Sequence, residues 1–174
     1  MTELESRPTG RREAGFTLIE LLIVMMIIAI AFFALRPAFA GAIRGAQERT
    51  MLRELVGLFT SARTEAIGRG SLIRVVFEPA EAAFFAEIQF EPERDLSVFD
   101  PLPLLGRSAV LVPEHLRVGK MEVAGRDQTD LERVHIYFYP DGRTDGLAML
   151  LVGRHGNDTL LEVSPTTGKV RIHA

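Results

Sequence analysis

The feature that most constrains the fold is an uninterrupted run of fifteen apolar residues from Leu21 to Leu35. Extended back to Phe16, the run covers twenty positions and is interrupted only by Thr17 and Glu20. A helix rises about 1.5 Å per residue, so this segment reaches about 30 Å, the thickness of the hydrocarbon core of a bilayer. The sequence therefore predicts a membrane-spanning helix over residues 16–36.

The composition outside this run is that of one soluble domain. The chain has 174 residues, of which 47% are apolar and 25% are charged, and its formal net charge is −3. These values exclude a basic nucleic-acid coat protein, an acidic disordered tail and a polytopic membrane protein. Because the chain contains no cysteine, it forms neither a disulfide framework nor a thiolate metal site. We expect one globular domain on a single membrane anchor.

Arginines flank the predicted span on both sides, so a count of positive charges does not set its orientation. Three arginines precede the span, and four lie at its end or after it: Arg7, Arg11 and Arg12, then Arg36, Arg44, Arg49 and Arg53.

The helical pattern continues beyond the span. We expect a leader over 1–15, the span, and an amphipathic helix over 37–69, with a kink or a locally melted turn at Pro37 because proline lacks the backbone N–H. Apolar residues recur at helical spacing in this second half, and the glycines at 68 and 70 are typical of a helix end. We expect three of these residues to pack against the following domain: Leu52, Leu55 and Phe59.

Residues 70–174 are expected to form an antiparallel β-domain, which makes the fold class α+β. Segments rich in β-branched and aromatic residues alternate with turn residues. The predicted strands are 72–77, 84–90, 108–112, 117–123, 134–139, 147–152, 159–163 and 169–172, and the first two are expected to form a hairpin. The segment 91–106 contains three prolines, so we expect an irregular surface loop there, which is also a candidate contact for a partner.

Four segments of the sequence resemble known families. Residues 15–24, GFTLIELLIV, resemble the N-terminal signature of type IV pilins and type II secretion pseudopilins. Residues 59–77 are similar to the helix end and first strand of H-type minor pseudopilins and the related FimT/FimU minor pilins. Residues 138–143 and 167–170 resemble two late strand-turn elements of the same group.

The resemblance implies a pilin-like prepilin of the bacterial inner membrane. A membrane aspartic peptidase, the prepilin peptidase, would cut after Gly15, and Phe16 would then be N-methylated. The processed chain would be a minor pseudopilin of the type II secretion pseudopilus, with its C-terminal domain in the periplasm and other pseudopilins as partners. A FimT/FimU-like minor pilin of a type IV pilus, related to DNA uptake, is the alternative. On either interpretation the chain is structural and not an enzyme.

Glu20 carries the physical part of this hypothesis. A carboxylate inside a spanning helix costs about 2.5 to 3.5 kcal/mol on insertion scales, so it marks a functional position. The ammonium created at Phe16 of a neighbouring subunit would pair with it and fix the axial register of assembly. Alternatively, in the free subunit Glu20 reaches the headgroups or is protonated. Gly15 suits the cleavage site because a confined peptidase site must accept an extended backbone.

A secretory signal peptide is a rival interpretation of the same segment. The sequence Ala38-Phe39-Ala40 before Gly41 fits a small-x-small cleavage pattern and would release a soluble domain. The charged Glu20 within the apolar run, and the helix that continues after Gly41, count against it.

Nothing in the sequence favours catalysis, a metal, a cofactor or a small-molecule substrate. There is no glycine-rich phosphate loop and no His-Glu-x-x-His motif. The segment 141–146 superficially resembles a calcium loop, but Arg143 occupies a ligand position, so a pair of turns is expected. Four cations near the C-terminus could form a small basic patch for DNA, but they are interleaved with acids, so we do not expect nucleic-acid binding: Arg143, Arg154, Lys169 and Arg171.

Overall fold

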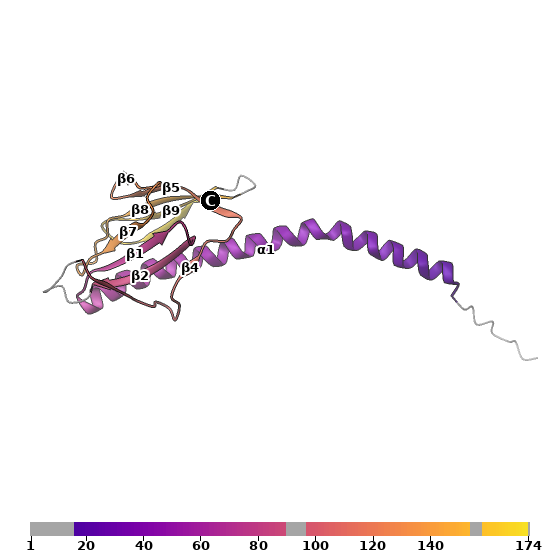
Figure 1. The fold of residues 1–174 in the computed structure, drawn as a ribbon, viewed down its shortest axis with the longest axis horizontal. Helices are drawn as coiled ribbons and strands as arrows, with labels where there is room; N and C mark the ends of the chain where they lie inside the picture. The colour runs from indigo at the N-terminus through magenta and orange to yellow at the C-terminus, as the bar shows by residue number, and fades with distance from the viewer. Residues whose placement is uncertain (1–15, 90–96, 154–157, 174) are drawn as a thin grey trace, which may run out of the picture. The chain divides into compact units, whose positions relative to one another are not determined.

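The computed structural model describes residues 16–89, 97–153 and 158–173; within the helix, the side chains of 34–40 lie outside the described part. The predicted leader over 1–15, and with it Gly15, also lies outside it. The chain divides into two units, Met1–Ala42 and Ile43–Ala174. Figure 1 shows one long helix, which runs through both units, and the strands of the second unit.

Helix α1 extends from Leu18 to Arg69. Its end has the expected chemistry: Gly70 adopts a left-handed φ of +63°, and the Ser71 N–H donates to the carbonyl of Ala66 at 3.2 Å. The helix is assigned without a break across Pro37, so the predicted melted turn is wrong. A proline removes one hydrogen bond, and the helical residues on both sides keep theirs. A kink at this position stays a prediction.

Among the residues that the structure describes, no helix is both long enough and apolar enough to cross a membrane. The predicted span over 16–36 includes residues 34–36, whose side chains lie outside the described part.

The first sheet of the second unit is antiparallel and contains five strands in the order β3-β2-β1-β7, with β4 also paired to β2. Its central hairpin joins β1 and β2, and Val75 lies opposite Ala86 on one side and Ile136 of β7 on the other. The strands are β1 (Ile73–Glu78), β2 (Ala83–Gln89), β3 (Phe99–Pro101), β4 (Val110–Leu111) and β7 (Val134–Phe138).

The second sheet is also antiparallel and has the order β10-β9-β8-β5-β6. Its longest strand contains a bulge at Gly119, where a side chain would meet Val152 Cγ2 at 2.6 Å, so only glycine fits without a local shift. The strands are β5 (Leu116–Val123), β6 (Arg126–Asp127), β8 (Leu147–Gly153), β9 (Asp158–Val163) and β10 (Val170–His173).

Two parts of the second unit differ from the sequence prediction. Within the segment expected to be an irregular surface loop, residues 99–101 form strand β3 at the edge of the first sheet, and Leu102 and Leu104 are buried. An edge strand accommodates proline because one side of its backbone has no partner strand, which is why the proline content misled the prediction. The two-residue strand β6 was also not predicted.

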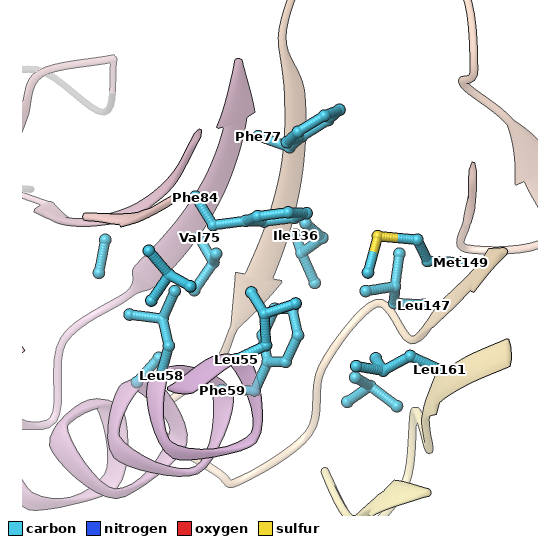
Figure 2. Close-up of a cluster of buried hydrophobic side chains, with 14 of the residues drawn as sticks. Leu55, Leu58, Phe59, Val75, Phe77, Phe84, Ile136, Leu147, Met149 and Leu161 are labelled. Atoms are coloured by element: carbon cyan, nitrogen blue, oxygen red, sulfur yellow. The ribbon is translucent and has the colours of Figure 1, made fainter. Parts of the chain in front are cut away.

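One hydrophobic core joins the helix to both sheets of the second unit. Figure 2 shows side chains of α1, of the first sheet and of β8 and β9 gathered in the same cluster. Phe59 of α1 packs edge-on against Phe84 with ring centroids 6.4 Å apart, and it stacks on Phe138 at 6.2 Å. Met149 and Leu161 bring the second sheet into this cluster and are fully buried.

Candidate processing and assembly site

Thr17 begins the long helix as its N-cap. Its side-chain oxygen accepts a hydrogen bond from the backbone N–H of Glu20 at 3.3 Å, and its carbonyl accepts from Glu20 and from Leu21 at 3.1 and 3.2 Å. The spacing Thr-x-x-Glu is that of a capping box. Sequence reasoning missed this role, although the pattern precedes an apolar run and is readable. Phe16 therefore lies immediately before the cap, and Glu20 lies in the first turn.

The first unit exposes apolar side chains along its whole described helix. The exposed fraction of the large ones ranges from 44% at Ile28 to 84% at Leu18, and Phe16 is 81% exposed. An ordinary amphipathic helix has one apolar stripe and one polar face, which this segment lacks. Such a helix needs an apolar medium or partner helices around it.

The second half of α1 packs against the β-domain through the residues that the sequence predicted for this contact. Leu55 and Phe59 are fully buried, and Leu52 is partly buried against the same cluster. In Figure 2, Leu55, Leu58 and Phe59 lie beside Phe84, Val75 and Ile136 of the first sheet.

Arg63 connects the helix to two glycine turns of the β-domain. Its Nε donates to the carbonyl of Gly142 at 2.9 Å. A Cβ added to Gly168 would lie only 2.3 Å from Cδ of Arg63, so the stem of the arginine passes directly over this turn. Both glycines have left-handed φ values, +83° and +62°. The three segments that carry the resemblance to H-type pseudopilins thus meet at one arginine.

The turn at 141–146 uses its acids for local bonds. Asp141 accepts from the Arg143 backbone N–H at 3.0 Å and pairs with its Nε at 2.6 Å, and the backbone bond is the main reason that the pKa of Asp141 is lowered. Asp145 accepts from the Tyr139 hydroxyl at 3.0 Å, and burial followed by this bond raises the pKa of Tyr139. Both acids are therefore engaged in holding the turn.

No group of three possible metal ligands occurs within the described ranges. Of the four cations near the C-terminus that could contact DNA, Arg154 lies outside these ranges and Arg143 is paired with Asp141. Lys169 and Arg171 line a cavity of about 380 Å³ together with acids of the neighbouring strands, among them Glu122 and Glu162. The surface around these cations therefore has mixed charge.

The N-terminal motif and the fold each have a match among known proteins. A model of the prokaryotic N-terminal methylation motif matches residues 10–35. A structure of the minor pseudopilin EpsH from the type 2 secretion system of Vibrio cholerae has a TM-score of 0.52 and 10% identity, and the match covers 75% of this chain and 95% of that one. The fold is that of a minor pseudopilin. A second EpsH structure gives a TM-score of 0.53 and 12% identity over 74% of this chain and 91% of its own.

These matches confirm the predicted α+β, pilin-like fold and the N-terminal methylation signature. No curated protein matches the sequence. Cleavage after Gly15 and the role of Glu20 stay predictions.

Proposed function

We propose that the chain is a minor pseudopilin of a type II secretion pseudopilus. The observation that carries the proposal is the combination of a methylation motif over residues 10–35 and a following domain with the minor-pseudopilin fold. The motif is a property of the local sequence and the fold is a property of the tertiary structure, so the two observations are independent. On this proposal the protein has a structural role in protein transport and is not an enzyme.

The geometry of the helix start supports cleavage by a prepilin peptidase after Gly15. Cleavage there leaves Phe16 as the only residue before the Thr17 cap, so the new ammonium stands at the N-terminus of α1. The helix macrodipole also places positive charge at this end. The ammonium and the positive end of the helix dipole together attract a nearby carboxylate, and Glu20 lies one turn away. N-methylation of Phe16 would keep the ammonium charge.

The exposed apolar helix of the first unit supports an anchor in the bacterial inner membrane. The similarity to minor pseudopilins supports a position of the β-domain in the periplasm. In the assembled filament, helices of other pseudopilins would take the place of lipid around residues 16–33. The carboxylate of Glu20 would then face the Phe16 ammonium of a neighbouring subunit. A buried charge without its partner is costly. The axial register that brings the carboxylate and the ammonium together is therefore favoured over the others.

Assembly of Glu20→Ala tests this proposal. The full-length variant is produced in cells with a type II secretion system, and its recovery with the other pseudopilins after cross-linking is compared with that of the unmodified chain. We expect normal leader removal and a reduced recovery. Glu65→Ala is the matched control, because Glu65 is also an acid on α1 and, within the described residues, its ion pair is with Arg69 four residues away. Equal recovery of both variants contradicts the role given to Glu20.

A further inference from the structure

The face of the first sheet that points away from the core carries aromatic rings and arginines. Successive side chains of a strand point to opposite faces, and Val75, Phe84 and Ile136 belong to the core cluster. Their sequence neighbours therefore lie on the opposite face, which we call the outer face. Such a face is usually polar when it meets only water, whereas aromatic residues and arginine are enriched at protein interfaces. The outer face carries these partly exposed side chains: Arg74, Phe85, Phe99, His135 and Tyr137.

The side chains of the outer face hold one another in place. The ring of Tyr137 meets the rings of Phe99 and His135 edge-on, with centroids 6.3 and 6.2 Å apart. The guanidinium carbon of Arg74 lies 3.8 Å from the centroid of the Phe99 ring, and its Nε donates to Oε2 of Glu87 at 2.6 Å. Because these groups are already fixed by their own contacts, they lose little conformational freedom when a partner binds.

A groove with a volume of about 330 Å³ borders the outer face along strand β7. One wall is formed by Arg133, His135 and Tyr137, which lie in or next to β7. The other wall is the β5–β6 hairpin of the second sheet, including Arg126. In the described part of the chain, β7 and β6 are each the last strand of their sheet. The groove therefore lies between the edges of the two sheets.

The charged groups of this groove leave a cation without a counter-ion. Arg126 is exposed and has no ion pair within the described residues. Arg133 donates from Nη2 to Glu78 at 3.1 Å, and its side chain remains 48% exposed. Among the described residues of the lining, the acid is Asp145, which already accepts from the Tyr139 hydroxyl. The groove therefore has room for a carboxylate that this chain does not supply there.

His135 indicates the electrostatic environment of the β7 wall. Its Nε2 atom is buried and has no hydrogen-bond partner within the described part of the chain. Burial is the main reason that the pKa of His135 lies below its ordinary value of 6.5. Arg74 and Arg133 lower this pKa further by repulsion, whereas Glu87 opposes them. A carboxylate bound in the groove would be attracted by the same two arginines.

We propose that the groove binds an acidic side chain of a different subunit of the pseudopilus, with its carboxylate facing Arg126 and the adjacent part of that subunit packed on the outer face. The carboxylate supplies the counter-charge that the groove lacks. A different subunit is the expected occupant because the proposed function makes this chain a minor component, whose neighbours in the filament are other chains. The inference rests on the proposed function and deepens it, since it assigns the partner a surface and a chemistry.

Site-specific photo-cross-linking of the full-length chain tests this contact in cells with a type II secretion system. Benzoylphenylalanine, a photoreactive and apolar residue, replaces Leu131, which lines the groove and is 50% exposed. We expect a cross-linked product that contains one different pseudopilin. The matched control carries the same residue in place of Leu111, which is 66% exposed and lies on β4, paired with β2 on the other side of the sheet. This control should not give that product.

Charge reversal separates specific docking from chance collision. Arg126→Glu in the chain with the photoreactive residue at position 131 should lower the yield of the product about tenfold. Arg117→Glu is the matched control, because Arg117 is also an exposed arginine and lies on β5 outside the lining of the groove, so the yield should stay the same. Mass spectrometry then identifies the partner's cross-linked peptide. Replacement of the acid in that peptide by arginine should restore the yield with Arg126→Glu.

The outcomes distinguish this inference from the proposed function. A product that is lost in Arg126→Glu and restored by the reversed charge in the partner supports the contact. The contact is overturned by a product that persists in Arg126→Glu, by one formed with a second copy of this chain, or by one formed with nucleic acid. If no product forms at position 131 in a chain still recovered with other pseudopilins, the contact is wrong and the proposed function stands. A chain that is not recovered with them contradicts the proposed function and the inference with it.

Discussion

The substitution Gly168→Ala tests the packing of Arg63 most sharply. Two costs combine at this position. A left-handed φ of +62° costs an alanine about 1 kcal/mol relative to glycine. The new Cβ would also lie 2.3 Å from Cδ of Arg63, and relief of such an overlap in a packed region costs about 1 to 3 kcal/mol. If Arg63 moves away, its bond to the Gly142 carbonyl is lost instead. We therefore expect Gly168→Ala to lower the free energy of unfolding by about 2 to 4 kcal/mol.

The assay is denaturant unfolding of the full chain in detergent, followed by the near-ultraviolet signal of the β-domain. Gly125→Ala is the matched control, because Gly125 has a similar φ of +70° but open space where the Cβ would be added. Only the conformational cost, about 1 kcal/mol, should appear there. Gly168→Ala measured in an Arg63→Ala background should likewise cost about 1 kcal/mol. If Gly168→Ala costs no more than Gly125→Ala in the unmodified chain, the packing argument is wrong.

Three other substitutions test separate parts of the fold. Phe59→Ala removes a fully buried ring and should lower the free energy of unfolding by about 3 to 5 kcal/mol, measured by the same denaturant assay; a loss under 1 kcal/mol would contradict its place in the core. Thr17→Ala removes the N-cap and should speed amide hydrogen exchange in the first turn of α1, whereas Thr64→Ala, on the exposed face near the helix end, should not. For Asp141 the folded pKa lies below its unfolded value of 3.8, so its contribution to stability is complete above that pH and is lost as the pH falls through the folded pKa. The free energy of unfolding of Asp141→Asn should therefore fall less between pH 5 and pH 2 than that of the unmodified chain, and parallel curves would refute the assignment.

The elements with strong local signals could be predicted from the sequence. The β1–β2 hairpin follows from alternating β-branched and aromatic residues around Pro79, and the helix end follows from Gly70. The capping role of Thr17 could also be predicted, from the Thr-x-x-Glu spacing. It was missed because Glu20 has a second explanation, as an acid inside a membrane helix.

The features that depend on distant residues could not be predicted in this way. The division into two sheets rests on long-range pairings such as that of β1 with β7, for which no local pattern exists. Arg63 meets Gly142 across 79 residues, and the side chain of Leu105 packs on Gly57, which is distant in the sequence. Strand β3 was obscured by its prolines, because composition alone does not separate an edge strand from a loop.

The first residue of the mature chain shows whether the protein is processed as a prepilin. The protein is purified from membranes of cells that contain a prepilin peptidase, and its N-terminal peptide is identified by mass spectrometry. We predict a mature chain that begins at N-methylated Phe16, and a chain that keeps its leader when the peptidase is absent or when Gly15 is replaced by leucine. A mature chain that begins at Gly41, or one that keeps its leader in the presence of the peptidase, would contradict it.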